Sequence, residues 1–254
     1  MIKITLYRLL VICFLNDLPA FFKCYLIYFM ESEKIISSVY SKKMRVAVFG
    51  SFYRGYHVLN ELLYGEVSRK INVVGVATDD VSQNFISPHK RVWQYPHTPA
   101  EKEMVSNIAE KAGIETYNGR VKSSEFYEIM ESRWKPDLCI MATFGQKIDS
   151  RLFNAPPLGF YNLHPCIDDA WPSRYVGGNP FQALLDDKKE HTVIALHRVD
   201  DDFDTGELLE YSEKIFIPPN ASVTDLHKIT SPIAAKLASR NINFIYENSG
   251  GFFV

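Results

Sequence analysis

Short apolar runs alternate with stretches of helix length along most of the chain after residue 43. Runs of Val, Ile, Leu and Ala without alternating polar positions are typical of strands buried on both faces, whereas apolar residues spaced at i, i+3 and i+4 indicate amphipathic helices. We predict strands over 45–49, 72–78, 138–142, 160–164 and 193–197, and helices over 56–63, 101–112, 125–133 and 222–246. This alternation predicts an α/β fold, with a Rossmann-like, mostly parallel sheet and helices on both of its faces.

The first 43 residues differ from the rest because Leu, Ile, Phe and Tyr dominate them without a clear period. The apolar run 9–15 is followed by Asn16, Asp17, Pro19 and Lys23, so the segment is neither a clean signal peptide nor a spanning helix. We expect 1–43 to be an N-terminal extension of uncertain role without stable membrane insertion. It either packs loosely or is not made in the cell, or it serves as an interfacial helix or partner-binding arm. The main domain then covers 44–210, and 211–254 forms a C-terminal strand and helix appendage.

Composition and charge narrow the class of protein. The chain has 254 residues, of which 46% are apolar and 23% charged, which suits a globular protein with a buried core. Its formal net charge is −2, and residues 44–254 alone carry −5, so long-range attraction to a nucleic acid backbone is not available. The four cysteines show no C-x-x-C spacing, and we interpret them as reduced thiols of a cytoplasmic protein.

The turn after the first predicted strand has the sequence Gly50-Ser51-Phe52-Tyr53-Arg54-Gly55. A glycine turn that leads into a helix favours anion binding. However, bulky residues stand where a dinucleotide pyrophosphate needs close backbone approach, and the G-x-G-x-x-G pattern is absent. This turn therefore argues against a nicotinamide-dependent oxidoreductase.

Two polar clusters follow predicted strands. Asn162-Leu163-His164-Pro165 ends one strand, and alternation places Asn162 and His164 on the same side of it. The stretch 199–206 carries four aspartates in a loop. Taken singly, the histidine can be a core residue and the aspartates a solvated loop. The loop lacks the ligand ladder of a calcium site, so we predict no metal.

Three motifs together resemble a known family. Residues 136–148 read PDLCIMATFGQKI, residues 154–165 read NAPPLGFYNLHP and residues 197–206 read HRVDDDFDTG. This pattern is similar to the formyltransferases that use 10-formyltetrahydrofolate, especially methionyl-tRNA formyltransferase and the sugar N-formyltransferases. The resemblance covers about 44–209 and implies the formyltransferase fold, with Asn162, His164 and Asp204 as catalytic residues. It also implies that the donor is bound by two loops, whose members are Phe144, Gly145, Gln146, Lys147 and Ile148, and Asp200, Asp201, Asp202 and Phe203.

The expected reaction suits these residue types. Transfer of a formyl group to an amine passes through a tetrahedral centre whose oxygen gains negative charge, and removal of one fixed donor to such an oxygen typically costs about 100- to 1000-fold in rate. Asn162 can supply an amide donor, and His164 a stronger one if a nearby carboxylate raises its pKa. Asp204 is the expected carboxylate, and it can help relay the proton that leaves the amine. Ordinary core packing is an equal explanation for Phe144 and Ile148.

The acceptor loop departs from the family pattern. Where relatives usually have Ser-Leu-Leu-Pro followed by Arg-Gly, residues 166–180 are longer and more aromatic. We predict that Trp171, Arg174 and Tyr175 bind the acceptor, Arg174 through a phosphate or carboxylate and the aromatic rings by stacking. A solvated arginine and packed aromatic rings are the alternative.

The acceptor itself is expected to be a small primary amine. Only 48 residues follow Gly206, which leaves little room for a basic tRNA-binding domain. We favour a nucleotide-linked amino sugar. The alternatives are an N5-hydroxyornithine-type siderophore precursor, or a methionyl-tRNA formyltransferase-like protein without the C-terminal tRNA-binding domain. We expect no nucleic acid partner, and a homodimer stays open.

Overall fold

The computed structural model describes residues 42–80, 82–83, 98–176 and 179–249. Residues 43–250 form one compact unit. The extension predicted for 1–43 lies outside the described residues except for its last two positions, so its proposed roles stay predictions.

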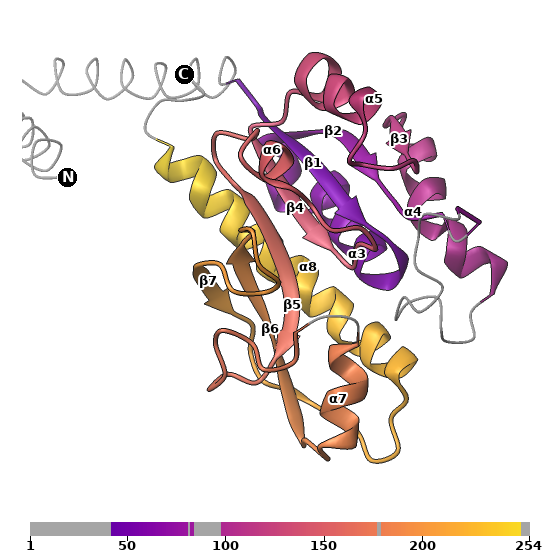
Figure 1. The fold of residues 1–254 in the computed structure, drawn as a ribbon, viewed down its shortest axis with the longest axis vertical. Helices are drawn as coiled ribbons and strands as arrows, with labels where there is room; N and C mark the ends of the chain where they lie inside the picture. The colour runs from indigo at the N-terminus through magenta and orange to yellow at the C-terminus, as the bar shows by residue number, and fades with distance from the viewer. Residues whose placement is uncertain (1–41, 81, 84–97, 177–178, 250–254) are drawn as a thin grey trace, which may run out of the picture. The chain divides into compact units, whose positions relative to one another are not determined.

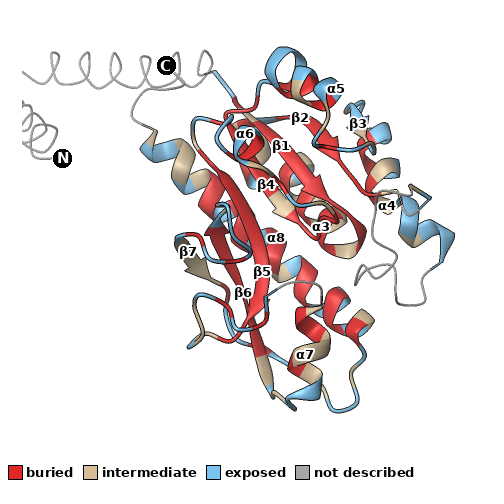
Figure 2. Ribbon diagram, in the orientation of Figure 1, coloured by how far each residue is buried: buried red, intermediate tan, exposed pale blue. Residues whose placement is uncertain are grey.

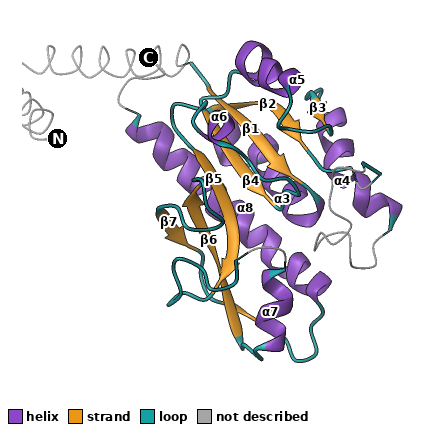
Figure 3. Ribbon diagram, in the orientation of Figure 1, coloured by secondary structure: helices purple, strands orange, loops and turns teal. Residues whose placement is uncertain are grey.

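A mixed sheet with strand order β3-β2-β1-β4-β5-β6-β7 forms the centre of the unit (Figures 1 and 3). The five strands β3, β2, β1, β4 and β5 pair with one another in parallel. Strand β6 runs antiparallel to β5, β7 and β8. The strands are β1 Met44–Gly50, β2 Ile71–Ala77, β3 Thr116–Tyr117, β4 Leu138–Ala142, β5 Phe160–Cys166, β6 His191–Arg198, β7 Leu208–Tyr211 and β8 Ile215–Phe216. The predicted α/β class with a mostly parallel sheet is confirmed.

Helices cover both faces of this sheet. On one face α3 packs against α8 and α4, and on the other α5, the π-helical turn η2 and α6 contribute to a shared core with β1, β4 and β5 (Figure 1). The helical segments are α3 Phe52–Tyr64, η1 Glu66–Arg69, α4 Pro99–Lys111, α5 Ser124–Glu128, η2 Ile129–Trp134, α6 Ser150–Phe153, α7 Pro180–Asp186 and α8 Val223–Asn248.

The core explains why the apolar runs form central strands. Figure 2 shows the middle strands buried along nearly their whole length. Phe49 is fully buried and meets Phe126 and Phe144 edge-to-face at ring-centroid distances of 5.8 and 5.6 Å. Burial of each such side chain stabilises the fold by about 1.5–3 kcal/mol. Edge-to-face geometry adds to this term because the positive edge of one ring meets the negative face of another.

Short elements account for the differences from the predicted pattern. Helix α3 begins at Phe52, four residues earlier than predicted, because Phe52 and Arg54 of its first turn are buried rather than solvated. Helix α7 lies in a stretch to which we assigned no element, where Asn179 caps the helix and Pro180 takes its first position. The predictions also omitted β3, α6 and β7, which have two to four residues each.

Strand β5 marks the change from parallel to antiparallel pairing. Asn162 of this strand is paired with Met141 of β4 on one side and with His197 of β6 on the other. Polar side chains of two central strands are thereby brought side by side within the buried sheet.

Candidate active site

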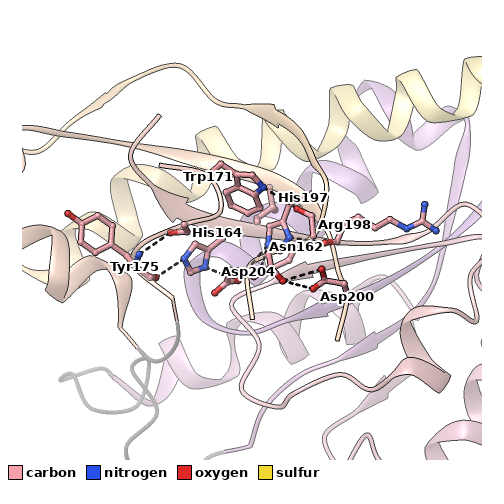
Figure 4. Close-up of polar contacts among 12 residues, drawn as sticks. Asn162, His164, Trp171, Tyr175, His197, Arg198, Asp200 and Asp204 are labelled. Atoms are coloured by element: carbon pink, nitrogen blue, oxygen red, sulfur yellow. Dashed lines mark hydrogen bonds and ion pairs between the residues drawn. The ribbon is translucent and has the colours of Figure 1, made fainter. Parts of the chain in front are cut away.

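Asn162, His164 and Asp204 meet around a single carboxylate oxygen (Figure 4). Nδ2 of Asn162 donates to Oδ1 of Asp204 at 3.1 Å, and Nδ1 of His164 lies 3.2 Å from the same oxygen. All three side chains are at least nine-tenths buried. The two sequence motifs, 40 residues apart from His164 to Asp204, therefore come together as one polar cluster in a low-dielectric setting.

The local backbone explains how Asp204 reaches the strand. Asp204 has a φ of 56°, a left-handed conformation that aspartate tolerates better than most residues. Two residues later, a Cβ on Gly206 would lie 1.9 Å from the carbonyl oxygen of Arg198, so only glycine fits there. The Asp-Thr-Gly sequence thus lets the β6–β7 turn fold back over the end of β6 and direct the carboxylate toward β5.

The hydrogen bonds of His164 define where its protons lie. Its Nε2 is 2.9 Å from the backbone carbonyl oxygen of Tyr175, which can only accept, so Nε2 carries a hydrogen. Its Nδ1 faces the Asp204 carboxylate, where an N–H is also favourable. This arrangement favours a charged imidazolium paired with an ionised carboxylate.

His197 belongs to the same cluster, although sequence reasoning did not select it. Its Nδ1 donates to the carbonyl oxygen of Arg198 at 2.9 Å, which leaves Nε2 as the acceptor for Nδ2 of Asn162 at 3.1 Å. Nε2 also lies 3.6 Å from Oδ1 of Asp204. His197 opens the motif at residues 197–206, but only the pairing of β5 with β6 places it beside Asn162.

The NH₂ group of Asn162 is oriented by these contacts. Its two hydrogens point to Asp204 and His197, so donation to a formyl oxygen requires one of these bonds to be exchanged. Our expectation that Asn162 donates to that oxygen stays a prediction.

The predicted acceptor loop lies over the cluster. Trp171 packs on the His197 ring at a centroid distance of 4.7 Å and donates its indole N–H to the carbonyl oxygen of Gly206 at 3.1 Å. The Tyr175 ring is buried and points away from the cluster, with its hydroxyl donating to Asp187 at 2.7 Å (Figure 4). The stacking surface that we predicted for Tyr175 is therefore covered, and its contribution is the carbonyl that holds His164. Arg174 is exposed, so its predicted contact with the acceptor stays a prediction.

The predicted donor loop, residues 144–148, is anchored rather than free. Phe144 and Ile148 are buried in the core, which agrees with the packing alternative. Gln146 donates to the carbonyl oxygen of Gly119 at 2.9 Å and accepts from the N–H of Val121 at 3.1 Å. With the side chains of Phe144, Gln146 and Ile148 occupied in this way, the loop presents backbone groups and the exposed side chain of Lys147.

The acidic loop approaches the donor loop through an exposed pair. The ammonium of Lys147 lies 4.9 Å from the ring centroid of Phe203, which is 56% exposed. Asp200 accepts from the hydroxyl of Thr205 at 2.9 Å and stabilises the turn, whereas Asp201 and Asp202 are exposed. The two loops that we predicted to bind the donor therefore contact each other beside the polar cluster, and an exposed aromatic ring with nearby backbone groups suits a flat heterocycle.

Two further findings concern the described residues only. They contain no group of three or more His, Cys, Asp or Glu side chains that could hold a metal ion. None of their helices combines the length and the hydrophobicity needed to cross a membrane.

Comparison with known proteins identifies the family. The family model described as "Formyl transferase" matches residues 43–241. The chain belongs to the formyl transferase family. The match extends about 30 residues beyond the resemblance seen in the motifs and includes most of α8.

The relatives by sequence are named methionyl-tRNA formyltransferases. One from Syntrophus aciditrophicus is 32% identical over 125 residues, covering 49% of this chain and 38% of the relative. Another from Kosmotoga olearia is 29% identical over 189 residues, covering 73% of this chain and 54% of the relative. The chain thus spans about half or less of the length of these relatives.

Solved structures agree on the fold. Phosphoribosylglycinamide formyltransferase from Anaplasma phagocytophilum has a TM-score of 0.62 at 14% identity, covering 82% of this chain and 88% of that one. A formyltetrahydrofolate deformylase from Pseudomonas syringae has a TM-score of 0.61 at 15% identity, covering 88% of this chain and 71% of that one. At such identities the likeness concerns the fold alone.

Proposed function

We propose that this chain transfers a formyl group from 10-formyltetrahydrofolate to a primary amine of a small acceptor. The observation that carries the proposal is the buried contact of Asn162, His164 and Asp204, within a chain of the formyl transferase family. The family supports the donor, and the anchored loop 144–148 beside Phe203 fits it.

His164 and Asp204 can have different roles in formyl transfer. The bound donor supplies the formyl carbon that the acceptor nitrogen attacks. The His164 imidazolium offers its positive charge to the formyl oxygen, which gains negative charge during transfer. Asp204 keeps His164 charged and can relay the proton that the acceptor nitrogen loses, directly or through water, to the folate nitrogen as the bond between that nitrogen and the formyl carbon breaks. No nucleophilic side chain is required, because the acceptor itself provides the nucleophile.

For the acceptor we propose a nucleotide-linked amino sugar. The exposed Arg174 beside the site can pair with a phosphate, and the charge of −5 over residues 44–254 disfavours a long nucleic acid. Methionyl-tRNA is the second candidate, because the sequence relatives carry that name. An N5-hydroxyornithine-type amine is the third candidate acceptor.

The test incubates the purified chain with 10-formyltetrahydrofolate and each acceptor in turn, with formylated product measured by mass spectrometry. We expect product with the amino sugar and none without an acceptor. Product with methionyl-tRNA or the hydroxyornithine alone would reject the acceptor, and no product with any amine would reject the transferase itself.

A further inference from the structure

Asp79 is a buried acidic residue that neither the motifs nor the polar cluster include. It follows β2, is 5% exposed, and makes contacts with the residues that follow two neighbouring strands. Its Oδ2 accepts from the hydroxyl of Ser51 at 3.1 Å and from the backbone N–H of Gly145. Its own N–H donates to Oγ of Ser51 at 2.9 Å.

The topology explains this meeting. β2, β1 and β4 are consecutive parallel strands, so their carboxyl ends lie at one edge of the sheet. Ser51 follows β1, Asp79 follows β2 and Gly145 follows β4. One carboxylate therefore joins the turns that leave three strands.

The contact has structural consequences for both partners. Ser51 is the N-cap residue of α3, yet its hydroxyl does not cap the helix, because it is bound to Asp79. A carboxylate near the start of α3 is also favourable for the helix dipole. The bond at Oδ2 is charge-assisted and buried, the class of hydrogen bond that contributes most when formed and costs most when broken.

Gly145 is fitted to this carboxylate. A Cβ at position 145 would lie 2.5 Å from both carboxylate oxygens of Asp79, closer than any side chain can come. The core holds the flanking Phe144 and Ile148, whereas Gly145 is held through its backbone alone. Asp79 thus fixes Gly145, a position of the loop that no side chain of its own can fix.

We propose that Asp79 is a positioning residue for the formyl donor, acting through the backbone of residues 144–148. The proposal rests on the proposed function, since it assigns that loop to donor binding. It implies that loss of the carboxylate weakens donor binding while the polar cluster at Asp204 stays intact.

The test compares Asp79→Ala and Asp79→Asn with the wild type in steady-state kinetics. Asp80→Asn is the matched control, because the Asp80 carboxylate accepts from the N–H of Ser82 in its own turn. We expect the KM for 10-formyltetrahydrofolate to rise about tenfold or more in Asp79→Ala, as the loss of a charged hydrogen bond implies. Asp79→Asn retains an acceptor oxygen and should recover part of this loss, while kcat changes by less than about threefold and the control stays at wild-type values.

Two measurements separate a failure of this proposal from a failure of the proposed function. Direct titration with 5-formyltetrahydrofolate, a stable reduced folate, should give weaker binding in both Asp79 variants. No binding to the wild type would reject the function, whereas equal binding to the wild type and both folded variants would reject the positioning role. Amide exchange at Gly145 should also accelerate in Asp79→Asn, and unchanged exchange there would overturn the proposal even if Asp79→Ala does not fold.

Discussion

A single oxygen of Asp204 serves three neighbours. His164 and Asn162 lie within 3.2 Å of it and His197 lies at 3.6 Å, all inside a buried cluster. Removal of the negative charge leaves the His164 imidazole without the partner that favours its charged form. The chemistry of the site is therefore more sensitive to residue 204 than the fold is, because the carboxylate sits on a surface turn rather than in a core strand.

For Asp204→Asn we expect a folded protein whose kcat falls by about 100- to 10,000-fold, the range associated with loss of a general acid–base group. Single-turnover formylation with a saturating acceptor measures the effect. Asp186→Asn is the matched control, since Asp186 is exposed on α7, outside every predicted site, and should retain wild-type activity. Equal activity in the two variants would contradict the assigned role of Asp204.

Cys166 permits a prediction about pH. Burial raises the pKa of its thiol to about 12. Only a thiolate reacts with alkylating agents, and at pH 8 about 1 in 10⁴ of these thiols is ionised. The raised pKa contributes stability below about pH 9, and this contribution is lost as the pH rises from there toward about 12.

Iodoacetamide at pH 8 should therefore leave Cys166 unmodified in the folded protein and modify it after denaturation, as peptide mass spectrometry will show. Cys166→Ala should retain formyl transfer, since the reaction needs no thiol. Rapid labelling of the native chain would contradict the buried environment of this residue.

At the scale of elements, the turns decide how the site closes. Trp171 connects the loop after β5 to the β6–β7 turn, through its stacking on His197 and its bond to the Gly206 carbonyl. The same loop supplies the Tyr175 carbonyl to His164. Displacement of this loop would therefore change the surroundings of both histidines at once.

Trp171→Ala should lower kcat at least tenfold and reduce the free energy of unfolding by about 2 kcal/mol, less than a fully buried tryptophan because the ring is only half-buried. Trp171→Phe retains a stacking ring and loses the N–H bond, so it should lie between Ala and wild type. Chemical denaturation and steady-state kinetics measure the two effects. A fully active Trp171→Ala would show that the loop is held by other contacts.

The length of an element decides whether the sequence predicts it. The central strands were predictable because each is a continuous apolar run, and the Asn162–His164 pair because alternation places both residues on one side of a strand. The short elements β7 and α7 were not, since stretches of four to seven residues carry little periodic signal. Asp79 and the Tyr175 carbonyl act through contacts between distant segments or through backbone atoms, which leave no local pattern in the sequence. His197 lies in a motif, but its contact with Asn162 follows only from the pairing of β5 with β6.

At the scale of the whole molecule, charge bears on the choice of acceptor. Residues 44–254 carry 22 basic and 27 acidic side chains. A protein that neutralises several phosphates of a nucleic acid releases counterions, and its affinity falls steeply with salt. An acidic domain that binds a small acceptor through one or two charged contacts shows a much shallower dependence.

We therefore expect the KM for a nucleotide-linked amino sugar to change by less than about tenfold between 50 and 200 mM salt, whereas several phosphate contacts to a tRNA would change affinity by about a thousandfold or more. Kinetics at several salt concentrations, with unacylated tRNA added as a competitor, measure both. Arg174→Ala should raise the KM for the sugar nucleotide and flatten its salt dependence, because one charged contact is lost. Competition by tRNA at micromolar concentration, together with a steep salt dependence, would instead favour methionyl-tRNA as the acceptor.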